Sequence, residues 1–267
     1  MNPESYQTSD GCDFSEFIRQ FRPKRLAITC DNIHEVKIGR LLGRGQGRKA
    51  YEGDWHGTKV AMKIPYEGNT YGGTLSGNEY DRIVKEVAVL QRLKRAPNIN
   101  RILGWCNKTI VVEKAEGTLR EMLYHHLTAQ RALEISLDIA KGVQQLHTLP
   151  NGPVTHGDIK TSQFLYDSKG RIFLGDLNHM KYSGLSSTNT KCNPHDEEDI
   201  HKIAGIMKGV LEKVEHKSRK YLQAMQDLIG EALDSDPVKR PSATEMTERI
   251  EAIGRKYGIS RRRSFSM

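Results

Sequence analysis

Two acidic side chains at the ends of one predicted β-hairpin constrain this chain more than any other feature. The apolar residues 164–166 and 172–174 flank a polar, glycine-ended turn at residues 167–170, as is typical of a hairpin. Asp158 lies shortly before the first strand and Asp176 shortly after the second. Because a hairpin returns the chain beside itself, the two carboxylates are expected to lie close together.

A glycine-rich turn and a lysine in the upstream half complement these carboxylates. Gly43, Gly45 and Gly47 occupy alternate positions between two β-like runs, and Lys63 follows in the run VAMK. Glycine lets the backbone approach a polyphosphate closely, and a lysine on a nearby strand can neutralise it. With one carboxylate to receive a hydroxyl proton and another to hold Mg²⁺, these are the parts that phosphoryl transfer from ATP requires.

These motifs occur in a fixed order along the chain: the glycine loop, the VAMK lysine, a helical glutamate, the HGDIK loop and the GDLN loop. In this order they resemble the eukaryotic-type protein kinase catalytic domain over roughly residues 36–255, in a divergent serine/threonine or tyrosine-kinase-like branch. The resemblance implies an α+β, two-lobed fold. A small antiparallel β lobe with one main helix would precede a larger, mainly helical lobe.

The hydrophobic pattern agrees with this order, because alternating strand-like runs come first and helical periodicity follows. The expected divisions of the chain are an N-terminal extension (1–31), a kinase-like domain (32–257) made of a small lobe (32–112), a hinge (113–117) and a large lobe (118–257), and a basic C-terminal tail (258–267).

The resemblance assigns the ATP-binding residues. Lys63 would bind the α- and β-phosphates under the glycine loop, and its expected partner is Glu86, by helical spacing, rather than Glu79 near the start of the helix. Backbone atoms of Glu113 and Ala115 would contact the adenine.

The resemblance also assigns the catalytic residues. Asp158 would orient the acceptor hydroxyl and accept its proton, and Asp176 would hold Mg²⁺. Lys160 would neutralise the transferring phosphoryl group. A lysine two residues after the catalytic aspartate resembles the pattern of serine/threonine kinases. His156 is expected to hold the loop by hydrogen bonds.

Two metal-binding positions depart from the family pattern. Gln163 replaces the asparagine that is the second metal ligand, and its extra methylene makes near-ideal octahedral coordination of Mg²⁺ harder. Asn178 replaces the glycine of the DFG motif; it would either supply an amide oxygen or take a positive φ, which asparagine tolerates. This arrangement is similar to protein O-mannose kinase, an active enzyme, so these changes do not imply loss of activity.

Other departures affect the loops around the site. Gly157 replaces the arginine that reads activation-loop phosphorylation, so control through that loop is not expected. Arg48 replaces the third glycine of the family's loop. It and Lys49 are expected to point to solvent, with contact to the phosphates as the alternative.

The segment that normally docks a peptide substrate is short. No APE motif occurs between Asp176 and Asp199, which matches the family's buried aspartate. Arg240 matches the arginine that pairs with the APE glutamate, and Glu197 or Glu198 is the expected replacement partner.

The charge, apolar runs and cysteines of the chain limit where the protein is expected to act and what it is expected to bind. A net charge of +8 could favour acidic partners or membrane surfaces, but the basic residues are spread over the chain, which favours an ordinary solvated surface. No nucleic-acid partner is expected. No apolar run reaches the ~18 residues of a membrane span, and the N-terminus does not resemble a secretory signal. The default location is the cytoplasm or nucleus.

The four cysteines show no CxxC spacing and are expected to be free thiols.

Three functions fit the residues. The first is transfer of the γ-phosphate of Mg-ATP to a serine or threonine hydroxyl of a protein. The second is a pseudokinase that binds nucleotide or acts as a scaffold, which Gln163 and the missing APE motif favour. The third is a kinase for a sugar or other small hydroxyl compound. The sequence does not define the oligomeric state.

Overall fold

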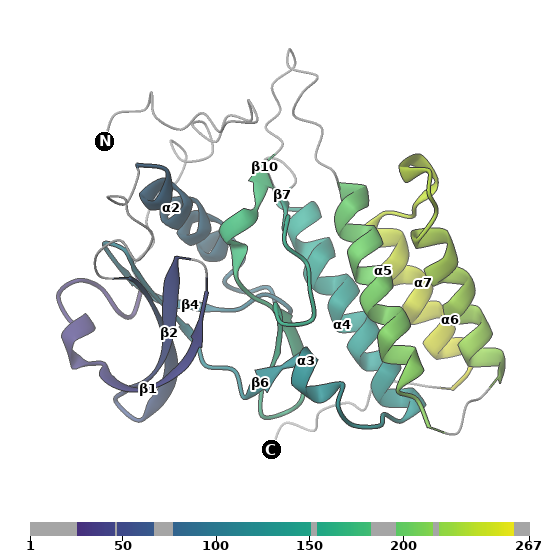
Figure 1. The fold of residues 1–267 in the computed structure, drawn as a ribbon, viewed down its shortest axis with the longest axis horizontal. Coiled ribbons are helices and arrows are strands. Elements are labelled where there is room, and N and C mark those ends of the chain that lie inside the picture. The colour runs from purple at the N-terminus through teal and green to yellow at the C-terminus, as the bar shows by residue number, and fades with distance from the viewer. Residues whose placement is uncertain are drawn as a thin grey trace, which may run out of the picture.

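The computed structural model describes residues 26–45, 47–66, 77–150, 154–182, 196–215 and 219–258. A β-rich part lies on one side and a bundle of helices on the other (Figure 1). This arrangement confirms the expected α+β, two-lobed architecture.

The small lobe is built on a five-stranded antiparallel sheet in the order β1-β2-β3-β5-β4. Its strands are β1 (Lys37–Arg44), β2 (Arg48–Trp55), β3 (Thr58–Pro65), β4 (Ile102–Cys106) and β5 (Thr109–Glu113). The tight turn between β2 and β3 has positive φ at both His56 (49°) and Gly57 (82°), as a two-residue hairpin turn requires. The Asp54 carboxylate accepts the Gly57 N–H at 2.9 Å and closes this turn.

One long helix, α2 (Gly77–Arg92), packs against this sheet. Ile83, Val87 and Leu90 recur at helical spacing on its buried face. They belong to a core that also contains Ile110 and Val112 of β5. The burial of this face fixes which side of α2 is turned toward the sheet.

Residues just before the sheet pair with its edge strand, although they were expected to belong to an extension. Ile28 is fully buried and forms a parallel bridge with Gly104 of β4. The Ile28 N–H donates to the Leu103 carbonyl at 3.1 Å, and the Trp105 N–H donates to the Ile28 carbonyl at 3.2 Å. A side chain at position 104 would collide with Ile28, so glycine permits this close approach. A short 3₁₀ turn, η2 (Ile33–Glu35), then leads into β1.

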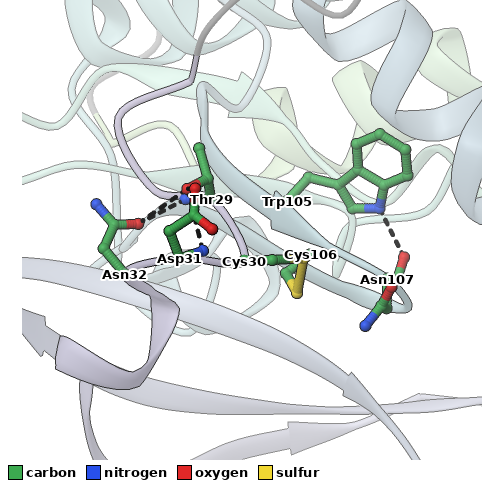
Figure 2. Close-up of a disulfide and its surroundings, with 7 residues drawn as sticks. All are labelled: Thr29, Cys30, Asp31, Asn32, Trp105, Cys106 and Asn107. Atoms are coloured by element: carbon green, nitrogen blue, oxygen red, sulfur yellow. Dashed lines mark hydrogen bonds between the residues drawn. A yellow bond between two sulfur atoms is a disulfide. The ribbon is translucent and has the colours of Figure 1, made fainter.

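The expectation of free thiols is wrong for two of the four cysteines. Cys30 and Cys106 form a disulfide with a Cα–Cα distance of 4.8 Å, at the end of β4 (Figure 2). They are 76 residues apart in sequence, and only the pairing of residue 28 with β4 brings them together. Cys12 and Cys192 lie outside the described residues. Because disulfides persist mainly in oxidising compartments, this pair gives no support to the expected cytoplasmic or nuclear location.

The two lobes meet at a short polar connection and a second sheet. After β5 the chain runs through residues 114–116 into a three-stranded sheet of order β6-β8-β9. Its strands are β6 (Gly117–Thr118), β8 (Phe164–Tyr166) and β9 (Ile172–Leu174). β8 and β9 form the predicted hairpin, in the register Phe164↔Leu174. A separate two-stranded pair joins β7 (Val154–Thr155) to β10 (Lys181–Tyr182).

The large lobe packs around one buried helix, α4 (Ala129–His147). The Thr128 hydroxyl caps it by accepting the Arg131 N–H at 3.1 Å. Apolar residues on several sides of α4 are buried, as the sequence predicts for a central helix. The other helical elements of this lobe are α3 (Leu119–Met122), α5 (Asp196–Glu212), α6 (Arg219–Ala232), η4 (Pro237–Lys239) and α7 (Ala243–Lys256). Of these, α5 and α7 pack directly on α4, and α6 packs on α5 and α7.

Several expectations fall on parts of the chain that the structure does not describe. These are residues 1–25 of the expected extension, residues 183–195 of the segment before α5, and residues 259–267 of the basic tail. Within the described ranges, no helix combines the length and apolar character that crossing a membrane requires.

Removal of the Cys30–Cys106 disulfide is expected to destabilise the protein, because the crosslink closes a long loop in the unfolded chain. The double variant Cys30→Ser/Cys106→Ser should lose about 2–4 kcal/mol of unfolding free energy in urea denaturation under non-reducing conditions. Peptide mass spectrometry after blocking of free thiols should recover the two cysteines as a linked pair. Recovery of both as blocked thiols from unreduced protein would contradict the assignment.

Candidate active site

A buried ion pair connects the central strand of the small lobe to its helix. Lys63 lies on β3, whose neighbours are β2 and β5, and its Nζ donates to Glu86 Oε1 at 2.8 Å. Glu86 is completely buried on α2. Burial acts to raise the pKa of Glu86, but the positive charges of Lys63 and Arg48 outweigh it and hold that pKa below its usual value. The predicted pairing of Lys63 with Glu86 is therefore confirmed.

Arg48 does not point to solvent, and that expectation is corrected. Its side chain is 9% exposed, and its Nη2 lies 2.5 Å from Glu86 Oε2. Arg48 is the first residue of β2 and directly follows the glycine turn, and its side chain is directed toward Glu86 of α2. The Glu86 carboxylate thus binds one cation at each oxygen. Lys49, the next residue, has its Nζ 5.2 Å from the centre of the Tyr66 ring, outside this pair.

The glycine turn closes directly over Arg48. The Gly45 N–H donates to the Arg48 carbonyl at 2.8 Å, and the Gly45 carbonyl accepts the Tyr66 hydroxyl at 3.0 Å. Gly43 faces open space, since a Cβ there would meet no atom within 4 Å. Gly47 follows the turn, and its carbonyl accepts the Tyr66 N–H at 3.4 Å. At Gly43 the backbone of this turn is thus uncovered by side chains.

The hairpin brings the two predicted aspartates to the same place. The amide nitrogen of Gln163 lies 3.0 Å from Asp158 Oδ2 and 3.4 Å from Asp176 Oδ2. Lys63 Nζ lies 3.6 Å from Asp176 Oδ1, which joins the small-lobe ion pair to the large-lobe hairpin. The convergence expected from the sequence is confirmed.

The HGDIK loop at residues 156–160, the catalytic loop by the family resemblance, is held in place by buried polar groups. Asp199 of α5 accepts the backbone N–H groups of His156 at 2.7 Å and Gly157 at 3.3 Å. The His156 Nε2 lies 2.9 Å from the Gly175 carbonyl, and its Nδ1 accepts the Asp158 N–H at 3.2 Å. Burial lowers the pKa of His156, so the ring is neutral and plays the holding role expected of it.

Asp158 and Lys160 form a close pair at the mouth of the site. The Lys160 Nζ lies 2.7 Å from Asp158 Oδ2, and both side chains are partly exposed. Partial burial acts to raise the pKa of Asp158, but hydrogen bonds from Lys160 and Gln163 lower it below the usual value. The carboxylate is therefore ionised at neutral pH and able to accept a proton.

Asp176 has the left-handed backbone conformation (φ 56°, ψ 70°), which is uncommon for a residue with a side chain. The 3₁₀ turn that follows it, η3 (Leu177–His179), buries Leu177 in the core and holds this geometry. Burial acts to raise the pKa of Asp176, but Lys63 and Arg48 lower it. Strained backbone of this kind concentrates at functional sites.

Asp176 and its neighbouring amide side chains carry oxygen atoms of the kinds that bind Mg²⁺. The Asn178 amide nitrogen lies 2.5 Å from Asp176 Oδ1, so two amides flank one carboxylate, the other being Gln163. Carboxylate and amide oxygens, with phosphate oxygens, are the ligands Mg²⁺ takes. Among the described residues no group of three or more His, Cys, Asp or Glu is suited to a metal ion. Mg²⁺ would be held by Asp176, by the nucleotide's own phosphates and by the amide oxygen of Gln163 or Asn178, whose amide nitrogens face Asp176 in this structure.

The predicted hinge residues lie in the connection between the two lobes. Glu113 ends β5, with its N–H donating to the Arg101 carbonyl at 2.9 Å, and the buried Val112 precedes it. Ala115 lies in the connection to β6, where its carbonyl accepts the Lys114 ammonium at 3.3 Å. The adenine contacts of Glu113 and Ala115 stay a prediction.

Arg240 does not form the carboxylate pair expected of it. Its Nη1 donates at 2.9 Å to the backbone carbonyl of Glu197, not to the side chain of Glu197 or Glu198, and its Nε donates to the Asp234 carbonyl at 2.9 Å. The arginine thus ties the start of α5 to the loop before η4 through main-chain groups, which no sequence pattern specifies.

The comparisons with known proteins agree with this geometry. The protein kinase domain family matches residues 36–193, more than half of the chain. The chain is 33% identical to receptor-like kinase TMK2 of Arabidopsis thaliana over 67% of its length and 20% of that protein. It is 31% identical to serine/threonine-protein kinase CTR1 of the same plant, over 58% of the chain and 19% of that protein. Dual specificity protein kinase shkD of Dictyostelium discoideum matches 96% of the chain at 25% identity, over 41% of its own length.

The chain belongs to the protein kinase domain family. It spans less than half the length of these curated relatives.

Gly157→Ala is expected to destabilise the catalytic loop, because φ is +75° there and a Cβ would collide with the His179 carbonyl. The unfolding free energy in urea should fall by about 1–3 kcal/mol. Gly205→Ala is the matched control, since a Cβ added to this exposed glycine of α5 would meet nothing outside its own helix within 4 Å. The control should gain up to about 1 kcal/mol from helix propensity. Equal stability of Gly157→Ala and wild type would contradict the assigned close contact.

Proposed function

We propose that this chain is an active protein kinase that transfers the γ-phosphate of Mg-ATP to a serine or threonine hydroxyl of a protein. The observation that carries the proposal is the convergence of Lys63, Glu86 and Asp176, with Lys63 2.8 Å from one carboxylate and 3.6 Å from the other. An ammonium beside the metal-binding carboxylate is what a bound triphosphate needs.

Each end of the nucleotide has a proposed set of contacts. Backbone groups of Glu113 and Ala115 bind the adenine edge, and the uncovered turn at Gly43, Gly45 and Gly47 closes over the phosphates. Lys63 neutralises the α- and β-phosphates. Mg²⁺, when bound at Asp176 with Gln163 or Asn178, supplies charge neutralisation to the β- and γ-phosphate oxygens.

The transfer itself is proposed to use Asp158 and Lys160. Asp158 orients the acceptor hydroxyl and takes its proton as the hydroxyl oxygen bonds to the γ-phosphorus. The bond from that phosphorus to the β–γ bridging oxygen breaks, and ADP leaves. Lys160, 2.7 Å from Asp158, neutralises charge on the transferring group.

The acceptor class rests on Lys160 and on the relatives. A lysine two residues after the catalytic aspartate resembles serine/threonine kinases, and CTR1 is named as a serine/threonine-protein kinase. Phosphoamino-acid analysis of labelled acceptor proteins tests this choice. A glycan panel run alongside tests the alternative of a sugar hydroxyl.

Asp158→Asn is expected to lower phosphate transfer from labelled ATP by about 100- to 10,000-fold, because the substituted amide cannot accept the hydroxyl proton. ATP affinity, measured by calorimetry, should stay within about twofold, since this side chain is not assigned to the nucleotide. Asp227→Asn makes the same substitution at an exposed position of α6 and controls for differences in purification between variants. It should be as active as wild type. Equal transfer by wild type and Asp158→Asn would contradict catalysis and favour a pseudokinase.

A further inference from the structure

Arg48 has a hydrogen-bonding group that the protein does not satisfy. Its guanidinium is fixed at one end by Glu86, 2.5 Å from Nη2. Its other terminal nitrogen, Nη1, is buried and has no hydrogen-bond partner among the described residues. A buried donor without an acceptor costs about 1–3 kcal/mol, so such a group is usually satisfied by an ordered water, an ion or a ligand. The planar guanidinium group of arginine, with its several N–H donors, is well matched to phosphate oxygens.

The contacts of Arg48 place its side chain next to the proposed nucleotide site. The residue begins β2 directly after the glycine turn, and its carbonyl accepts the Gly45 N–H at 2.8 Å. Its side chain shares Glu86 with Lys63, which in turn lies 3.6 Å from Asp176. The guanidinium therefore lies beside the lysine proposed to bind phosphate.

The charges of the site show what Arg48 adds. Lys63 and Arg48 contribute two positive charges, and Glu86 and Asp176 contribute two negative charges, so the four side chains balance. Without Arg48 the group would carry one net negative charge and would repel a triphosphate unless a metal ion compensated. The influence of Arg48 extends to the metal-binding carboxylate, because its charge helps to lower the pKa of Asp176.

We propose that Arg48 is a second phosphate-binding cation of the nucleotide site, whose Nη1 donates to a phosphate oxygen and sustains nucleotide binding when Mg²⁺ is absent. This inference rests on the proposed nucleotide site but not on catalysis. Gln163 stands where the family has a metal-binding asparagine, and its longer side chain is expected to coordinate Mg²⁺ less well. A positive charge fixed in the protein at Arg48 offsets this weaker metal coordination.

The test is calorimetric titration of the full chain with ATP and with adenosine, both in EDTA. Wild type should bind ATP more tightly than adenosine. Arg48→Met should weaken ATP binding by about 10- to 100-fold, as expected for the loss of a charge-assisted hydrogen bond. Adenosine affinity should stay within about twofold, because it carries no phosphate.

Two further variants separate phosphate binding from support of the fold. Lys49→Met makes the same charge change one residue away and should leave ATP affinity within about twofold of wild type. Arg48→Lys keeps a charge for Glu86 but lacks the planar fork, and it should lose part of the ATP affinity while adenosine binding persists. Arg48→Lys is the variant to compare with wild type if Arg48→Met does not fold.

Three results would overturn the inference. One is ATP binding by wild type in EDTA that is no tighter than adenosine binding. Another is unchanged ATP affinity in both Arg48 variants. The third is an equal loss of ATP and adenosine affinity, which would mean that Arg48 only holds α2 through Glu86. Failure of the proposed catalysis gives a different result, in which wild type transfers no phosphate yet Arg48→Met still weakens ATP binding selectively.

Discussion

The buried carboxylate of Glu86 is the interaction on which the small lobe depends. An isolated charge in a protein interior is very unfavourable, and here Lys63 and Arg48 each compensate one oxygen. The three side chains come from α2, β3 and the start of β2, so one carboxylate ties the helix, the central strand and the end of the glycine turn together. Removal of one partner of a buried pair typically costs about 3–5 kcal/mol, which makes this arrangement hard to change.

A second buried carboxylate organises the large lobe in the same way. Asp199 accepts two consecutive backbone N–H groups of the catalytic loop, and the neutral His156 ring connects that loop to Gly175, next to Asp176. The contact of Lys63 with Asp176 then joins the two systems at 3.6 Å. The site therefore forms where these two groups of buried contacts meet, and such preorganisation is what the proposed phosphoryl transfer would require.

The sequence predicted the elements well where burial imposes a period, as in α2, α4 and the hairpin that carries the two aspartates. It also predicted the pairing of Lys63 with Glu86, because helical spacing puts Glu86 on the buried face. It did not predict the direction of Arg48, since a residue at the end of a glycine turn has no periodic neighbours and arginine is usually exposed. The Cys30–Cys106 disulfide was missed because its partners are 76 residues apart and only a single edge-strand bridge aligns them. The main-chain partners of Arg240 have no sequence signal of any kind.

The most direct test of a triphosphate bound between the two lobes is a crystal structure of the chain with Mg²⁺ and a non-hydrolysable ATP analogue. We predict that phosphate oxygens lie within hydrogen-bonding distance of Lys63 and that Mg²⁺ bridges Asp176 to the phosphates. A nucleotide bound elsewhere on the protein, or a site that stays empty at saturating nucleotide, would contradict it.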